Sequence, residues 1–455
     1  MSPATANRLS VFRRQAHQSA LGANITTPHQ FDSEPLMIRL ATGTTSRLKL
    51  LSSVVLAVCH PSAGARQRNR DRRAPGILLS RRLLTCSLFG LLLGCSDTVN
   101  PQGCTVRLSS GCWTFLGLDG KWITALAETP WGLYAGTADA GVFRLVGDRW
   151  QSVGLNIARG YISALVYTGT TPPRLFAAIG AKRDTAGTND TQGAVYATED
   201  GGGTWKPRDG GLDARQAAIG DDAWAYSLAV DPGNPNRIFM GLDYPVMRSE
   251  DGGASWQFVW GSENDLRGWM WIPSLVVFPG RDGHIWAGGQ TAIFTAAILG
   301  SSDWGDTWKF VDPTPTFENS VQSLAVDPAD PDRLWAGLQG VTPGVLRSAD
   351  GGQSWDYVLR LSASSAAGSV NAIAETSHSL YAVAWENFRA PPDGNGTPLT
   401  DLGLYRSRDA GESWDTLAVP TGAGGGVTTT VDPLGRLVIG TRPGSGGSGV
   451  WLFAP

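Results

Sequence analysis

Four carboxylates lie between the predicted strands of this chain, near aromatic residues in the sequence. They are Asp222, Glu263, Asp265 and Glu318. Hydrolysis of a glycosidic bond needs two carboxyl groups about 5 to 10 Å apart, on opposite sides of the bond. These four residues are therefore the candidate catalytic residues, and glycoside hydrolysis is the reaction that they would support. The other interpretation is a site that binds a ligand without catalysis, in which charged groups only orient the ligand.

Arginine, tyrosine and tryptophan side chains occur in the same stretches. Six of them are the candidate ligand-binding residues: Arg159, Tyr161, Trp224, Arg267, Trp269 and Trp271. Aromatic faces cover apolar sugar surface or peptide side chains, and charged groups fix the orientation of the ligand. The mixture predicts a site for a glycan or a peptide. The alternative is that loops are polar in any protein and that Trp side chains close the ends of the sheets.

A repeat indicates the elements that must position these residues. The pattern Ser/Thr-x-Asp-x-Gly-x-Ser/Thr-Trp occurs five times, with Asp200, Asp251, Asp303, Asp350 and Asp409. Successive copies are 51, 52, 47 and 59 residues apart, which is the period of a four-stranded propeller blade. Each copy is predicted to be a hairpin turn, in which Asp accepts backbone hydrogen bonds and Gly takes a positive φ. A protein needs an active site only once, whereas a repeat fold needs the same structural turn in each repeat. The five Asp residues are therefore interpreted as structural.

The repeat, for example Ser249-x-Asp251-x-Gly253-x-Ser255-Trp256, resembles the Asp-box or BNR repeat. That repeat occurs in sialidases, sortilin-type receptors, xyloglucanases with two propellers and photosystem II assembly-factor propellers. The resemblance covers about residues 110–455 and implies a β-propeller, but it does not select an activity. The sialidase pattern is broken, because that family has six blades and an early Arg-Ile-Pro segment, whereas Trp271-Ile272-Pro273 lacks the Arg and lies mid-chain.

The predicted fold is all-β, a single seven-bladed propeller of four-stranded antiparallel blades over residues 111–455. The last blade offers only three strands, at 427–431, 436–440 and 449–453. Residues 111–117 match 148–154, so the strand around Trp113 is expected to complete the last blade and to remove an exposed edge. Residues 182–192 and 385–402 are expected to be long insertions on the ligand-binding face.

The N-terminal region is expected to lie outside the propeller. Residues 1–76 have no repeat and are expected to be a disordered leader or upstream sequence translated from a mis-assigned start. In residues 77–95 a charged segment and an apolar run precede Leu92-Leu93-Gly94-Cys95, which resembles a bacterial lipobox with Cys95 as the lipidated residue. The alternatives are a plain signal peptide or a buried apolar segment. Residues 96–110 are expected to be a linker, and the protein to face the periplasm or lie at the outer membrane.

Cysteine and histidine residues give no metal-site pattern, and no metal or cofactor is predicted. Cys104 and Cys112 are a pair in the mature chain. An exported protein occupies an oxidising compartment, so a disulfide between them is expected, with two free thiols as the alternative.

Charge is distributed unevenly along the chain. Residues 1–94 contain 13 Lys and Arg and three acidic residues. Because the whole chain has 37 basic and 40 acidic residues, the remainder has 24 against 37, which disfavours a nucleic-acid partner. Two functions follow. The first is a monomeric, lipid-anchored propeller that binds a glycan, peptide or envelope protein without catalysis. The second is a glycoside hydrolase of sialidase or xyloglucanase type.

Overall fold

The computed structural model describes the second of two units into which the chain divides after Asp97. The described residues are 104–155, 160–169, 171–181, 195–208, 210, 225–242, 245–260, 270–278, 281–291, 294–314, 319–361, 368–389, 399–443 and 447–455. The predicted leader, the signal peptide and Cys95 lie outside them. None of these residues belongs to a helix with the length and hydropathy needed to cross a bilayer.

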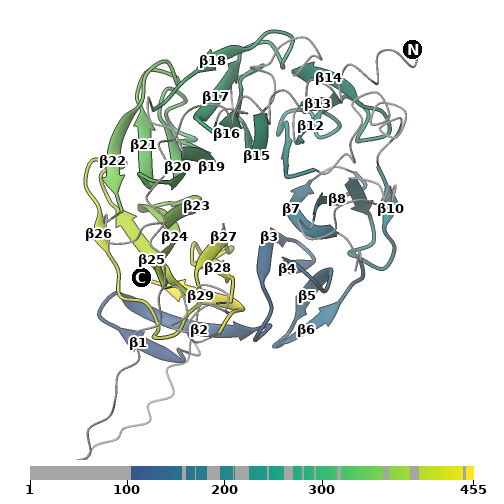
Figure 1. The fold of residues 1–455 in the computed structure, drawn as a ribbon. Helices are drawn as coiled ribbons and strands as arrows, with labels where there is room; N and C mark the ends of the chain where they lie inside the picture. Colours follow the sequence, from purple (N-terminus) through teal and green to yellow (C-terminus); the bar gives the residue numbers. More distant parts are fainter. Residues whose placement is uncertain are drawn as a thin grey trace, which may run out of the picture. The chain divides into compact units, whose positions relative to one another are not determined.

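The described residues form antiparallel sheets of consecutive strands (Figure 1). The first sheets contain β3 (Ile123–Thr129), β4 (Gly132–Thr137), β5 (Val142–Val146) and β6 (Arg149–Ser152); β7 (Gly160–Thr168), β8 (Arg174–Ala181), β9 (Val195–Thr198) and β10 (Lys206–Pro207); β11 (Ser227–Val230), β12 (Ile238–Gly241), β13 (Val246–Ser249) and β14 (Gln257–Trp260). The next is β15 (Met270–Val277), β16 (Ile285–Thr291), β17 (Ala296–Ser301) and β18 (Lys309–Val311). The predicted all-β class with four-stranded antiparallel sheets is confirmed.

Two further groups of four strands are joined into one eight-stranded sheet by pairing between β20 and β23. They are β19 (Asn319–Val326), β20 (Leu334–Gly340), β21 (Gly344–Ser348) and β22 (Asp356–Arg360), then β23 (Gly368–Thr376), β24 (Ser379–Arg389), β25 (Leu399–Ser407) and β26 (Asp415–Thr416). The expected insertion at 385–402 is shorter than predicted, because both β24 and β25 extend into it. Pairs such as Trp385 with Leu402 continue the ladder there.

The last sheet combines the two ends of the described chain. Its strands are β27 (Gly426–Val431), β28 (Leu437–Thr441), β29 (Val450–Ala454), β2 (Gly111–Gly117) and β1 (Val106–Leu108). β2 pairs antiparallel with β29, and Trp113 lies opposite Phe453. The expectation of a linker over 96–110 is wrong for residues 106–108, which form β1. Cys104 and Cys112 are joined by a disulfide, and β1 folds back on β2 within the loop that this bond closes.

Glycines on second strands let neighbouring sheets approach closely. A Cβ at Gly136 of β4 would lie 2.4 Å from the side chain of Ile162 on β7, and a Cβ at Gly440 of β28 would lie 2.6 Å from Ile123 on β3. Each first strand contacts the first strand of the following sheet, and β27 also contacts β3. Figure 1 shows these strands around a common centre, the arrangement of a β-propeller.

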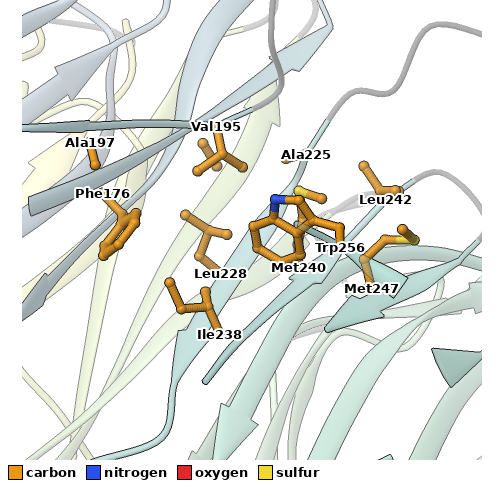
Figure 2. Packing of buried hydrophobic residues seen from close by; sticks show 11 residues of the cluster. Phe176, Val195, Ala197, Ala225, Leu228, Ile238, Met240, Leu242, Met247 and Trp256 are labelled. Atoms are coloured by element: carbon orange, nitrogen blue, oxygen red, sulfur yellow. The ribbon is translucent and has the colours of Figure 1, made fainter. Parts of the chain in front are cut away.

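The hydrophobic core lies between successive sheets rather than inside any one of them. Figure 2 shows one cluster, in which Phe176 of β8 and Val195 of β9 pack with Leu228, Met240 and Trp256 of the following sheet. Similar clusters lie between other neighbouring sheets. Burial of these side chains is what holds one sheet to the next, because each sheet alone would expose both faces.

The alternation of strand direction gives the sheets two different edges. We call the side of the sheets at which first strands begin and second strands end the loop edge. We call the opposite side, at which first strands end and the turns between third and fourth strands lie, the turn edge. The five repeated Asp turns all connect a third strand to a fourth, so they lie at the turn edge. The described residues that end a fourth strand or begin the next first strand lie at the loop edge.

Candidate functional site

The five repeated Asp turns share one hydrogen-bond pattern. In the turn of Asp251, Oδ1 accepts a hydrogen bond from Ser249 Oγ at 2.8 Å and from the Ser255 backbone N–H at 2.8 Å. Oδ2 accepts one from Ser255 Oγ at 2.6 Å, and Gly253 N–H donates to Ser249 Oγ at 2.8 Å. The turns of the other four Asp residues make the same contacts. Both carboxylate oxygens are therefore used within the turn.

These hydrogen bonds keep the five carboxylates ionised. The backbone N–H of Thr204, with the hydroxyls of Thr198 and Thr204, lowers the pKa of Asp200 to about 2. The pKa of Asp409 is lowered to about 2 by Ser413 and Ser407. In Asp350, burial opposes the lowering, but the hydrogen bonds outweigh it and the pKa is again about 2. A general acid at neutral pH needs a pKa near 7, so these groups are unsuited to that role. In the part of the chain that is described, no three metal-binding side chains cluster.

Charged residues at the turn edge are largely paired with one another. Arg237 contacts Asp231 at 3.1 Å and Glu250 at 3.0 Å. Arg333 contacts Asp327 at 2.9 Å. Two other pairs of the same edge are Arg174 with Glu199 and Arg347 with Glu412. Each guanidinium thus already has a carboxylate partner, and this edge offers little free charge to a ligand.

Polar side chains near the beginning of several first strands connect one sheet to the next. Ser163 Oγ of β7 donates to the Ala225 carbonyl at 2.6 Å, and Ser227 Oγ of β11 donates to the Ile272 carbonyl at 2.8 Å. Asn371 Nδ2 of β23 donates to the Gly426 carbonyl at 2.8 Å. These hydroxyls and this amide therefore hold neighbouring sheets together.

The predicted catalytic carboxylates cannot be placed. Asp222, Glu263, Asp265 and Glu318 lie outside the described residues, as do four of the predicted ligand-binding residues, Arg159, Trp224, Arg267 and Trp269. In the sequence, all eight occur between a fourth strand and the next first strand. Their relation to one another stays a prediction.

Tyr161 and Trp271 are the two predicted ligand-binding residues that the structure describes. Both were expected in loops, but Tyr161 lies in β7 and Trp271 in β15, because Tyr161 pairs with Gly180 and Trp271 with Gln290 on the second strands. The ring of Tyr161 lies over Gly180, where a Cβ would be 2.6 Å from Cζ. Both residues are near the beginning of their strands and so lie at the loop edge.

Aromatic side chains of neighbouring sheets meet at the loop edge. Tyr226, directly before β11, and Trp271 of β15 pack edge to face, with ring centroids 5.8 Å apart and an interplanar angle of 86°. Such a pair provides a rigid, partly apolar surface with polar atoms at its margins. This is the kind of surface that binds the apolar face of a sugar or a peptide side chain.

A second aromatic group at the loop edge was not predicted. Trp122 directly precedes β3, Trp385 lies near the end of β24, and Arg442 directly follows β28. The Arg442 guanidinium carbon lies 4.8 Å from the ring centroid of Trp122 and 5.7 Å from that of Trp385. Alignment of the predicted first and second strands across the blades would have placed these residues at one edge. No pattern in the sequence indicates that they touch.

Comparisons with known proteins give a fold but no family. No protein-family model matches the chain. A xyloglucanase of Paenibacillus sp is 24% identical over 203 residues, which are 36% of this chain and 20% of that protein. The match therefore spans about a fifth of the relative's length.

Solved structures share the architecture at low identity. A chain of the Mitotic Checkpoint Complex is 13% identical, with a TM-score of 0.50, and the match covers 83% of this chain and 100% of that one. YCF48 from Cyanidioschyzon merolae is 12% identical, with a TM-score of 0.48 and coverage of 75% and 98%. An ancestral GH74 enzyme is 22% identical, with a TM-score of 0.46 and coverage of 64% and 36%. At such identities the likeness concerns the fold alone.

Proposed function

We propose that residues 111–455 form one seven-bladed propeller of Asp-box type, which β2 closes as the outer strand of the last blade. The pairing of β2 with β29 supports this, as does the contact of β27 with β3. The Trp150 indole N–H donates to the Leu116 carbonyl of β2 at 2.8 Å, just as Trp205 donates to the Val153 carbonyl after β6. With respect to Trp150, β2 thus occupies the position of the outer strand of a preceding blade.

The proposal includes a lipid anchor on Cys95. Its support is the sequence before this residue, in which two arginines and an apolar run precede Leu92-Leu93-Gly94. Lipidation of Cys95 would hold the propeller at the cell envelope, facing the periplasm or at the outer membrane.

The function that the geometry supports best is non-catalytic binding of a glycan, peptide or protein partner at the loop edge. One contrast carries this proposal. Aromatic side chains of neighbouring sheets meet at both edges, as Tyr226 with Trp271 at the loop edge and as Trp131 with Tyr167 at the turn edge. The four arginines named above at the turn edge have carboxylate partners, whereas Arg442 at the loop edge lies over the Trp122 ring and has no such partner among the described residues. Ligands bind where polar and aromatic groups converge without mutual neutralisation.

Glycoside hydrolysis is the second candidate function. The similarity to a xyloglucanase over 203 residues favours it. Asp222, Glu263, Asp265 and Glu318 remain the candidate catalytic residues, and two of them would have to converge within about 10 Å.

A glycan array combined with a glycosidase-substrate screen tests both functions. The full chain, purified in mild detergent, is compared with Trp271→Ala at the loop edge and with the double variant Asp222→Ala, Glu263→Ala. Leu434→Ala is the matched control, since Leu434 is 76% exposed in a turn-edge loop.

Three results decide between the candidates. Binding without turnover that Trp271→Ala weakens and Leu434→Ala leaves intact supports the non-catalytic role. Product release that the double carboxylate variant abolishes supports the hydrolase. If neither glycan binding nor product release is detected, a glycan ligand is excluded. Pull-down from the cell envelope then tests a peptide or protein partner.

A further inference from the structure

Arg442 has an environment unlike that of the arginines at the turn edge. Its guanidinium lies between the rings of Trp122 and Trp385, and burial lowers its pKa. Among the described residues, no carboxylate lies within ion-pair distance of it, and its Nε atom is buried without a hydrogen-bond partner. Arg208 and Arg406 also have a buried Nε without a partner, but both form ion pairs, with Glu199 and Asp415.

The backbone around Arg442 is held by close contacts. Arg442 N–H donates to the Gly425 carbonyl at 2.9 Å. A Cβ at Gly424 would lie 1.9 Å from the Arg442 carbonyl oxygen, so only glycine fits there. Trp385, 7% exposed, is fixed between Ser369 and Leu402 in the sheet. The side chain of Arg442 is therefore presented by a rigid frame, while Trp122 is 38% exposed.

A desolvated guanidinium without an acidic partner is complementary to a carboxylate. Its planar fork matches the two carboxylate oxygens, and flanking indole rings strengthen the charge interaction by excluding water. The group lies at the ends of strands, whereas an extended peptide adds along the side of an edge strand. An exposed indole face instead matches the apolar face of a pyranose ring.

We propose that Trp122, Arg442 and Trp385 form a subsite for an acidic sugar, in which Arg442 binds the carboxylate of a uronic acid and Trp122 stacks on its ring. This inference rests on the proposed binding function and specifies its ligand class. The net negative charge of residues 95–455 does not prevent it. Ionic screening over about 8 Å limits the reach of distant charges.

Isothermal titration calorimetry tests the subsite with three uronate trisaccharides, of galacturonic, glucuronic and mannuronic acid, each with its methyl ester as the neutral probe. The full chain in mild detergent is compared with Arg442→Gln and Trp122→Ala. Arg360→Gln is the matched control, because Arg360 also stacks on an aromatic ring, at 3.6 Å from the Tyr357 centroid, and ends the fourth strand β22 at the same edge. Circular dichroism melting confirms that each variant folds.

We expect at least one uronate to bind about tenfold more tightly than its ester. Arg442→Gln should remove that preference, Trp122→Ala should weaken acid and ester alike, and Arg360→Gln should change neither. Equal binding of acid and ester, or an acid preference that survives Arg442→Gln, would overturn the subsite. Loss of neutral-glycan binding in Trp271→Ala would still support the proposed function in that case.

A peptide with a free C-terminal carboxylate and its amidated form are the remaining probes. Binding of the free acid that depends on Arg442, without uronate binding, would overturn the sugar assignment. Failure of every glycan and peptide probe, in the array and in the calorimetry, would overturn both the subsite and glycan binding.

Discussion

Asp350 shows how a residue type suited to catalysis is used for structure. Its Oδ1 atom accepts hydrogen bonds from Ser348 Oγ at 2.8 Å and from the backbone N–H groups of Gln353 and Ser354 at 2.9 Å. Its Oδ2 atom accepts one from Ser354 Oγ at 2.6 Å. Both oxygens are thus used within the turn, and a pKa of about 2 disfavours uptake of a proton at neutral pH. Arg442 is the opposite case, since its cation lies between two indole rings without an acidic partner among the described residues.

Replacement of Asp350 by Asn should change how stability depends on pH. The folded-state pKa of about 2 lies below the ordinary 3.8, so the carboxylate stabilises the fold above pH 3.8 and this contribution is lost as the pH falls toward 2. Because water screens a half-exposed group, we expect Asp350→Asn to lower the free energy of unfolding by about 1 kcal/mol at pH 7. Urea unfolding at pH 7 and pH 2 measures this. An equal loss at both pH values would contradict the account.

Gly352 tests the close contact between a repeated turn and its neighbouring sheet. It has φ of +81°, and a Cβ there would lie 2.4 Å from the Trp286 ring. We expect Gly352→Ala to destabilise the protein by about 2 to 4 kcal/mol, through backbone strain and displacement of the ring. Thermal unfolding followed by circular dichroism measures the change.

Gly435→Ala is the matched control for that substitution. Gly435 has φ of +75° with nothing within 4 Å of a Cβ, so only the backbone strain of about 1 to 2 kcal/mol applies. Equal losses in the two variants would mean that contact with Trp286 contributes nothing.

At the scale of elements, the repeated turns join sheets as well as strands. The Trp256 indole N–H donates to the Arg208 carbonyl at 2.8 Å, and Trp308 donates to the Val259 carbonyl at 2.9 Å. In both cases the acceptor belongs to the outer strand region of the preceding sheet. At the centre, Ser163 and Ser227 bond to carbonyls of the following sheet. The sheet of β11 to β14 is therefore fixed to both of its neighbours, at its inner and at its outer strands.

Trp256→Phe should loosen the connection between the second and third sheets. Trp256 is 3% exposed, and loss of its N–H leaves the Arg208 carbonyl without this partner, which costs about 1 to 3 kcal/mol. Amide hydrogen exchange in β9 and β13 should rise. Trp355→Phe is the control, since the Trp355 N–H donates to Gly352 of its own turn at 3.2 Å and its loss should leave exchange in the preceding sheet unchanged.

At the scale of the molecule, the described chain joins its two ends in one sheet. Trp113 of β2 is fully buried and lies 4.7 Å from Phe453 of β29, measured between ring centroids. The last sheet also contacts the first sheet, through residues of β27 and β3. An array without such pairing would leave strand edges open to other chains.

Trp113→Ala tests the proposed closure. We expect a loss of about 3 to 5 kcal/mol, typical of a buried Trp. In a closed propeller, hydrogen exchange should rise in β29 and also in β6, because Trp150 of β6 donates to the Leu116 carbonyl of β2. Phe258→Ala, at a 39% exposed site on β14, should alter neither strand. A change confined to β1 and β2 would speak against closure.

Cys95→Ser tests the proposed anchor. Loss of the lipid should move the protein from the membrane to the soluble fraction, because the lipid is the proposed attachment to the membrane. Cell fractionation detects the shift, with Cys104→Ser, Cys112→Ser as the cysteine control. A wild-type protein whose mass shows no lipid would contradict the anchor directly.

The spacing of the repeat was enough to predict the all-β class, the sheet order and the structural role of the five Asp turns. These are local properties: a turn needs Asp, Gly and Ser or Thr at fixed positions, and a blade needs a fixed length. Strand ends were less accurate, as Tyr161 and Trp271 show, because pairing with the next strand extended the ladder beyond the local pattern.

The loop edge was predictable only in part. Tyr161 and Trp271 were found because they stand beside other polar and aromatic residues in the sequence. Trp122, Trp385 and Arg442 come from widely separated strands, and they meet only because the first sheet lies beside the last. Sequence alone thus determined the repeating unit, whose contacts are local. The tertiary structure decided which side chains share one edge, because that depends on how whole sheets pack.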